Sequence, residues 1–129
     1  MREPRAGIGW STGRIARRGR YADWMSTPAW LNFRRGWLAW WVHGQDREPI
    51  CQACGSAWTL RDGDLHHRSY RRLGREDYRD VIPLCRDCHT RWHTLFESNP
   101  AWQRLGRPLA TDVLVAALRR HASTSRSTP

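Results

Sequence analysis

The sequence predicts a small α+β domain that a bound metal ion holds together. Three observations lead to this fold class. The chain has 129 residues, and a domain of that size can bury only a small apolar core. A bound metal ion or a disulfide is therefore a good candidate for stabilising it. Its four cysteines fall in two Cys-x-x-Cys pairs. Short strand-like runs and stretches of helical spacing both occur around these pairs.

The cysteine pairs, Cys51/Cys54 and Cys85/Cys88, predict a closed structural zinc site. In a reducing compartment this spacing is typical of four thiolates around one tetrahedral zinc ion. Two small redox loops, one in each pair, are the alternative.

The charge of the chain favours an anionic polymer as partner. Its formal charge is +10, from 22 basic and 12 acidic residues, and all 22 basic residues are arginine. Four thiolates and one zinc ion would change this by −4 and +2, to +8. Arginine favours bidentate contacts with phosphate. We therefore expect a nucleic acid as partner, with a basic but inert surface as the alternative.

The apolar runs are too short for a membrane partner. The longest runs have six residues, such as "WLAWWV" (residues 37–42), against the roughly 18 residues that a membrane span needs. The start of the chain also has no apolar stretch of signal-peptide length. We expect a cytoplasmic, intracellular protein of a bacterium or a phage.

Composition divides the chain into three parts. Residues 1–20 carry six arginines and one acid, with glycines between them, and are predicted to be a flexible basic arm. Residues 123–129, "STSRSTP", are predicted to be disordered. The zinc-stapled domain lies between, at 21–122.

Two helices are predicted to flank the metal-binding part. The first covers about 27–43, because Thr27 can cap it, Pro28 suits its first turn and Gly44 can end it. Aromatic residues recur along it at helical spacing and are predicted to face the core: Trp30, Phe33, Trp37 and Trp41. In the alternative, this Trp-rich helix contacts a protein partner or forms a homodimer. The second helix covers about 111–122.

Short elements between the helices carry the cysteines and histidines. "AWTL" and "DLHH" flank an Asp-Gly turn signal and are predicted to pair as a hairpin. "VIPLC" leads into the second cysteine pair, and "CHTRWHTLF" opens a helix that ends at Asn99 and Pro100.

Four histidines in these elements predict a second metal site. His89 and His93 are four residues apart on a helix and therefore point the same way. His66 and His67 are neighbours on a strand, where adjacent side chains diverge, so one of them can complete the metal site while the other accepts a proton. Three protein ligands and an open position are typical of a catalytic metal site. Buried or zinc-capping histidines are the alternative.

A metal ion beside a basic loop and a free histidine is suited to phosphodiester cleavage. The ion can stabilise charge on the phosphoryl and leaving oxygens, and a neutral histidine can activate water. Three imidazoles suit zinc, nickel, cobalt or manganese better than magnesium.

The run "LHHRSYRRLGREDYRDVIPLCRDCHTRWH", residues 65–93, strongly resembles the HNH endonuclease family. The resemblance implies the ββα-metal fold, in which two strands and a helix hold one ion. Upstream, "YADWMSTPAWLNFRRGWL" is similar to the helical lead-in of small stand-alone members that carry a four-cysteine zinc. Together the resemblance covers about residues 21–96.

The resemblance also implies roles for individual residues. His66, His89 and His93 would hold a catalytic divalent ion (Zn²⁺, Ni²⁺, Mn²⁺ or, as often described for related sites, Mg²⁺), and His67 would be the general base. DNA, most simply double-stranded, would be cut to a 5′-phosphate and a 3′-hydroxyl. Asp80 stands where the family has asparagine, which both donates and accepts hydrogen bonds; we expect it to play a supporting role.

The loop beside the proposed base is basic. Some of its arginines are expected to contact the DNA backbone: Arg68, Arg71, Arg72 and Arg75. Tyr70 and Glu76 could orient a histidine. The rival interpretation is a non-catalytic zinc-dependent DNA-binding module, or a nuclease subunit that depends on a partner.

Overall fold

The computed structural model describes residues 20–127, so the predicted basic arm, apart from Arg20, lies outside the described part, as do residues 128–129. Residues 20–25 are helical. The remaining elements are α2 (Pro28–Gln45), β1 (Gly63–His67), the 3-10 turn η1 (Tyr78–Asp80), β2 (Val81–Cys85), α3 (Arg86–Glu97), α4 (Pro100–Leu105) and α5 (Arg107–Ser127).

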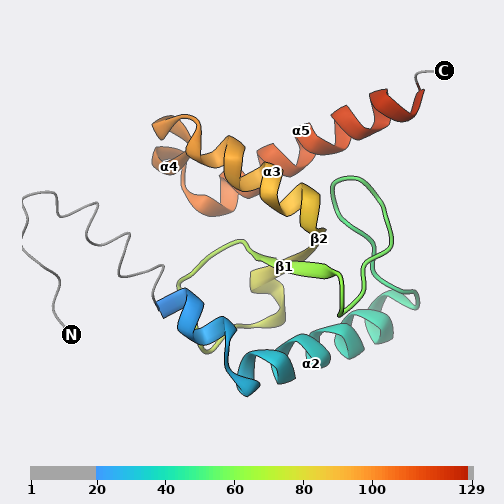
Figure 1. Ribbon diagram of the computed structural model, residues 1–129, viewed down its shortest axis with the longest axis vertical. Coiled ribbons are helices and arrows are strands. Elements are labelled where there is room, and N and C mark those ends of the chain that lie inside the picture. Colours follow the sequence, from blue (N-terminus) through green and yellow to red (C-terminus); the bar gives the residue numbers. More distant parts are fainter. Residues whose placement is uncertain (1–19, 128–129) are drawn as a thin grey trace, which may run out of the picture.

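The two strands form an antiparallel sheet that lies between two helical layers. In Figure 1, α2 runs along one side of the sheet, and α3 and α5 cover the other. The predicted α+β fold class is thus confirmed, and β1, β2 and α3 build a small ββα-metal fold.

Helix α2 begins where the sequence predicts. The Thr27 side chain accepts a hydrogen bond from the Trp30 amide (3.1 Å), and Pro28 stands in the first turn. The end differs: Gly44 lies inside the helix, and Asp46 caps it with a left-handed φ of 55° and an amide bonded to the Val42 carbonyl (2.8 Å). The hydrogen-bonded cap, rather than the first glycine, sets the end of the helix.

The predicted pairing of "AWTL" with "DLHH" is wrong, because β1 pairs with β2 instead, with His67 opposite Val81. The Trp58 amide donates to the Pro49 carbonyl (3.1 Å), which ties this run to the start of the first cysteine pair. The Gly63 amide donates to the Thr59 carbonyl (2.8 Å), so residues 59–62 close a turn rather than extend a strand.

Glycine is required at the start of β1. A Cβ on Gly63 would collide with the Trp58 indole, whose Nε1 donates to the Asp64 carbonyl (2.7 Å). This close approach packs Trp58 beneath the sheet and holds the first residues of β1 in place.

The core consists of two clusters, one on each side of the sheet. The cluster towards α2 contains Trp30, Trp37, Trp58, Leu65 and Val81. The cluster towards α3 and α5 contains Cys51, Ala53, Leu84, Cys88, Trp92, Ala110, Leu114, Val115 and Leu118. The aromatic stripe of α2 therefore faces the core, as predicted, while Trp40, off the stripe, is 40% exposed.

The C-terminal part is more helical than the sequence predicts. Asn99 caps an additional helix, α4, through the Ala101 amide (2.9 Å), and Gly106 ends it with a φ of 99°. Helix α5 then starts at Arg107 rather than near residue 111. It continues to Ser127, through most of the segment predicted to be disordered, with the Thr124 hydroxyl bonded to the Arg120 carbonyl (3.0 Å).

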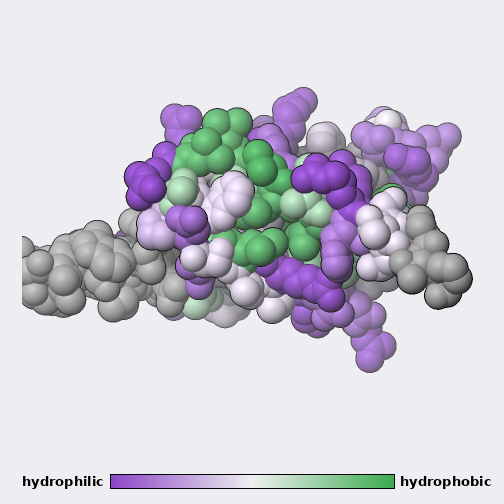
Figure 2. Space-filling view, turned by 90° about the horizontal axis from the view of Figure 1, so that it is seen from above, coloured by the Kyte–Doolittle hydropathy of each residue, from purple (hydrophilic) through white to green (hydrophobic). Residues whose placement is uncertain are grey.

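The surface over α3, α4 and α5 is mixed. Figure 2 shows apolar side chains gathered on this face between hydrophilic ones. The exposed large apolar side chains of these helices are Leu95, Leu105, Leu109 and Val113. Within residues 20–127, no helix is both long enough and apolar enough to cross a membrane.

Candidate active site and metal centres

The four cysteines converge, two from the loop before β1 and two from the junction of β2 and α3. Their sulfurs all lie within 4.8 Å of one another. The Sγ atoms of Cys54 and Cys85, from different pairs, are 3.8 Å apart. Contact between the pairs is what one tetrahedral site requires and what two separate redox loops do not provide. The cluster therefore suggests a zinc site.

Backbone amides turn towards these sulfurs, as in other zinc knuckles. The amides of Ala53 and Cys54 lie 3.4 and 3.5 Å from Cys51 Sγ, and the Cys88 amide lies 3.4 Å from Cys85 Sγ. Burial opposes ionisation of the Cys54 thiol, but hydrogen bonds from Ser56 outweigh it and lower the pKa to about 7. The thiolate form that binds a metal is therefore favoured at Cys54.

Three imidazoles converge at a second point, His66 from β1 and His89 and His93 from α3. A ring nitrogen of each lies within 4.8 Å of the others. The Nε2 atoms of His89 and His93 are 3.1 Å apart. Two ligands of one tetrahedral ion, at bonds of about 2.0–2.1 Å, would be separated by about 3.3 Å. The spacing of the rings therefore fits a shared divalent ion.

The His66 ring presents one nitrogen with nothing to bind. Its Nε2 lies 3.0 Å from the Thr111 hydroxyl of α5, while its Nδ1 is buried and has no hydrogen-bond partner among the described residues. Burial, and then the charge of Arg107, hold the pKa of His66 well below its ordinary value. The ring is thus neutral, as a metal ligand must be, and the buried nitrogen fits a metal bond.

Asp64 orients a second ring of this group. Its Oδ2 is 2.9 Å from His89 Nδ1, which leaves Nε2 to face the shared point. Burial opposes ionisation of Asp64, but the hydrogen bond and charge of His89 keep its pKa below the usual value. A carboxylate behind a ligating histidine fixes the tautomer and orientation of the ring. Asp64 was not predicted as a site residue, although strand alternation places it on the same face as His66.

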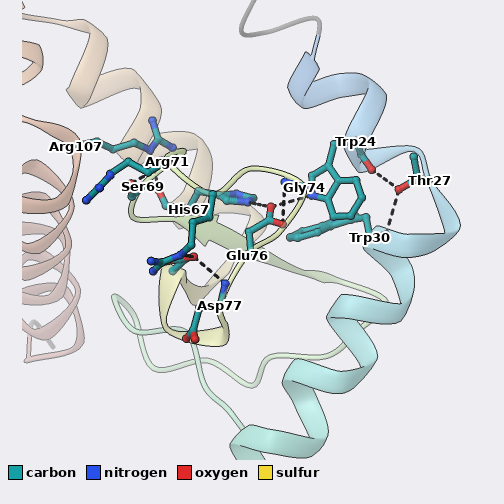
Figure 3. A network of polar contacts seen from close by, with 12 residues as sticks. Trp24, Thr27, Trp30, His67, Ser69, Arg71, Gly74, Glu76, Asp77 and Arg107 are labelled. Carbon is teal, nitrogen blue, oxygen red and sulfur yellow. Dashed lines mark hydrogen bonds and ion pairs between the residues drawn. The ribbon is translucent and has the colours of Figure 1, made fainter.

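His67 points away from that group, into the aromatic cluster beside α2. Its Nε2 lies 2.7 Å from Glu76 Oε2, and its ring stacks on Trp30 with centroids 5.4 Å apart (Figure 3). Nδ1 is buried without a hydrogen-bond partner in the described part of the chain, and the residue is 1% exposed. The two neighbouring histidines therefore have different surroundings.

The contacts of Glu76 keep its carboxylate ionised and fixed in position. Besides His67, it accepts from Trp24 Nε1 (2.8 Å) and the Gly74 amide (3.1 Å) (Figure 3). Burial opposes ionisation, but the hydrogen bonds, first that from His67, lower the pKa of Glu76 below its ordinary value. This carboxylate can therefore orient the His67 ring.

Asp80 braces the loop between the two strands. It accepts two hydrogen bonds from Arg72 (2.6 and 2.9 Å) and one from the Asp77 amide (2.8 Å). The hydrogen bond from Arg72 is the main reason that the pKa of Asp80 is lowered. Its backbone carbonyl accepts from the Arg68 amide (2.7 Å), directly after His67. Asp80 thus holds the backbone that follows the proposed base.

The four loop arginines separate into two groups. Arg68 forms an ion pair with Asp112 (2.8 Å) and Arg72 with Asp80 (2.6 Å). Arg71 and Arg75 are exposed, and neither has a carboxylate partner in the described part of the molecule. Arg71 and Arg75 are therefore the ones whose charge remains available to an incoming anion.

An open cleft of about 450 Å³ lies beside two tyrosines that contact His67, although His67 itself does not line it. It is lined by Arg20, Tyr21, Asp23, Trp24, Tyr70, Arg71, Leu73 and Gly74. The rings of Tyr21 and Tyr70 contact His67, with centroids at 5.7 and 5.4 Å. Burial is the first cause that raises the pKa of Tyr21 to about 12, so its hydroxyl stays protonated. Tyr21 therefore covers the proposed base from the cleft side.

Arg107, the first residue of α5, joins the two groups of histidines. Its Nε donates to the His67 carbonyl (2.7 Å), and its guanidinium lies over the rings of Tyr70 (4.2 Å) and Trp92 (4.8 Å). Burial lowers the pKa of Arg107. Neither Arg107 nor Thr111 was predicted as a site residue, because each lies 40 residues or more along the chain from its histidine partner.

Residues 51–95 match the model of the HNH endonuclease family. The matched segment spans both cysteine pairs, both strands and α3 up to Leu95. Neither the curated proteins nor the solved structures gave a match. The matched segment carries the zinc-type cysteine cluster and the histidine cluster on the ββα arrangement described above. Residues 51–95 are therefore similar to an HNH endonuclease domain, both in sequence and in the ββα arrangement.

Proposed function

We propose that this protein is a metal-dependent endonuclease that hydrolyses DNA phosphodiester bonds. HNH nucleases act on nucleic acid, and the family suggests endonuclease activity. One observation carries the proposal to this chain: three imidazole nitrogens converge on one point, while the adjacent histidine is held apart by a carboxylate. Three ligands and a separate base are the parts that metal-assisted hydrolysis needs.

In this mechanism His66, His89 and His93 would hold the divalent ion. When bound, the ion would stabilise negative charge on the phosphoryl and leaving oxygens. Asp64 and Thr111 orient two of the rings that would hold it, His89 and His66. The nitrogen ligands suit Zn²⁺, Ni²⁺ or Mn²⁺, and the family resemblance adds Mg²⁺.

His67 acts as the general base. With a proton on Nε2 donated to Glu76, the Nδ1 atom keeps its lone pair and can take a proton from the attacking water. Asp80 supports this step indirectly, because it holds the backbone next to His67. By the family resemblance, the products are a 5′-phosphate and a 3′-hydroxyl.

Double-stranded DNA is the proposed substrate. The chain carries a charge of +10, and Arg71, at the cleft, together with Arg75 can contact the backbone phosphates. A cytoplasmic location is part of the proposal, because four thiols held as zinc ligands suit a reducing compartment.

A partner-dependent nuclease is the second candidate, and one observation favours it. His67 is 1% exposed and is covered by Tyr21 and Trp30. Water and phosphate can reach Nδ1 only after the covering residues shift. DNA itself, or a protein that displaces residues 20–25, would cause this shift. A binding module without catalysis would need no such opening.

The deciding experiment is nicking of supercoiled plasmid with a panel of divalent ions, using the parent and His67→Gln. We expect the variant to lose about 10²–10⁴-fold in rate while it keeps zinc, thermal stability and DNA binding. His121→Ala removes an exposed histidine outside the site and is the matched control. A His67→Gln variant that cuts as fast as the parent would rule out His67 as the base. If the parent binds DNA but does not cut it with any ion of the panel, the result would favour the non-catalytic binding module.

A further inference from the structure

We infer that Arg107 binds the scissile phosphate and is a catalytic residue of this site, supplied by α5 from beyond the matched HNH segment. This inference rests on the proposed function, since it names the group that holds the substrate of the same reaction. Three features of Arg107 carry it: its place between the base and the metal ligands, its missing counter-ion and its fixed orientation.

The guanidinium lies between the two groups of histidines. Its Nε is bonded to the carbonyl of His67 (2.7 Å). On its other side it lies over Trp92 (4.8 Å), whose ring is in turn 4.2 Å from His66 and 5.0 Å from His93 between centroids. In the proposed reaction, the water activated by His67 attacks a phosphate that also faces the ion held by His66 and His93. This phosphate would lie beside the Arg107 guanidinium.

Arg107 has no counter-ion in the described structure. Ion pairs there engage Arg68, Arg72, Arg79 and Arg86, but no carboxylate pairs with Arg107. Most of its side chain is nevertheless buried. A buried cation is costly unless an anion accompanies it. A phosphate at this place would provide that anion.

The orientation of the guanidinium is set in advance. It lies over the Tyr70 and Trp92 rings, and its one hydrogen bond within the described residues uses Nε alone. The four N–H bonds on the two terminal nitrogens make no hydrogen bond within the described residues. A planar fork held in this way matches two oxygens of one phosphate. A purely structural arginine would leave fewer donors unused.

The test combines cleavage with binding of a phosphodiester. Arg107→Ala, Arg107→Lys and the control Arg104→Ala are compared in plasmid nicking, with kcat and KM measured separately. Arg104 is an exposed arginine in α4, close to Arg107 in sequence. Binding of the dinucleotide dTpdT is measured by calorimetry in the His67→Gln background, where turnover is suppressed. Zinc content and Tm report the fold.

We expect Arg107→Ala to lose about 10²–10³-fold in kcat/KM, chiefly in kcat, and at least about tenfold in dTpdT affinity. Arg107→Lys should be intermediate, because it keeps the charge but not the fork. Added guanidinium chloride at low millimolar concentration should restore part of the Arg107→Ala rate and leave His67→Gln unchanged. A structural role would not give this rescue. Arg104→Ala should match the parent.

The outcomes separate the two proposals. Parental kcat/KM and dTpdT affinity in Arg107→Ala overturn the role of Arg107 and leave the nuclease proposal intact. Binding of dTpdT that depends on Arg107, without cleavage by the parent under any ion, supports the phosphate site and contradicts the nuclease proposal. If Arg107→Ala unfolds, Arg107→Lys decides, and a folded lysine variant with parental kinetics overturns the inference.

Discussion

The Oε2 atom of Glu76 lies 2.7 Å from Nε2 of His67, and the same oxygen accepts from the indole of Trp24 (2.8 Å). The proposed base is therefore oriented by a carboxylate from the loop between the strands, and that carboxylate is itself held by the segment before α2. A carboxylate that accepts the Nε2 proton leaves the lone pair of Nδ1 available to accept a proton.

Glu76→Gln should slow cleavage without removing the metal sites. The amide keeps an oxygen near His67 but loses the charge, so we expect kcat to fall by about tenfold or more. Plasmid-nicking kinetics at one fixed pH measure this effect, with zinc content and Tm as checks on the fold. Glu48→Gln, at an exposed loop position, is the control. A parental kcat in Glu76→Gln would show that Glu76 only supports the fold.

Asp80→Asn should change how stability depends on pH. Arg72 lowers the pKa of Asp80 in the folded protein, so the ionised carboxylate adds stability above its ordinary pKa. That contribution is lost as the pH falls through the lowered value. The parent should therefore lose Tm more steeply than Asp80→Asn below about pH 4. At pH 7 the variant should melt lower by at most about 4 °C, because Arg72 is exposed. Parallel Tm curves would mean that this ion pair adds no stability.

Removal of the cysteine-bound zinc should unfold the domain. We expect one tightly held zinc per chain that survives dialysis against a weak chelator, and a second ion that exchanges easily at the histidines. Cys88→Ser should lose the first ion and melt far below the parent, while His93→Ala should lose only the second. Elemental analysis with circular dichroism tests this. An equal effect of both substitutions on Tm would contradict the division into a structural and a catalytic centre.

Tyr21→Ala should uncover the proposed base. The Tyr21 ring contacts His67 and Tyr70, so its loss opens the cleft side of His67. We expect several-fold faster plasmid nicking, with little change in zinc content. Trp40→Ala removes an exposed aromatic ring of α2 and is the control. Slower nicking by Tyr21→Ala would instead assign Tyr21 to substrate binding.

The local features of this fold were readable from the sequence, while the long-range ones were not. Helical spacing and Thr27 located the start of α2, and the Cys-x-x-Cys pairs located the sulfur cluster. The strand pairing was mispredicted, because turn signals at Asp62-Gly63 report local chain reversal but not which run becomes the partner of β1.

The same division holds within the site. His66, His89 and His93 converge as their spacing and strand–helix placement suggested. Arg107 and Thr111 reach them only because Gly106 turns the chain so that α5 starts beside the sheet. Such a contact spans 40 residues or more and leaves no periodic signal in the sequence.

Helix α5 connects the histidine cluster with the cysteine cluster. Its first turns carry Arg107 and Thr111 to the histidines, and two turns later Arg119 donates to the carbonyl of Gln52, inside the first Cys-x-x-Cys pair (2.7 Å). One residue inserted between Thr111 and Arg119 would rotate one end by about 100° relative to the other. The number of residues between Thr111 and Arg119 therefore determines whether the two ends of α5 can reach the histidine cluster and the cysteine cluster at the same time.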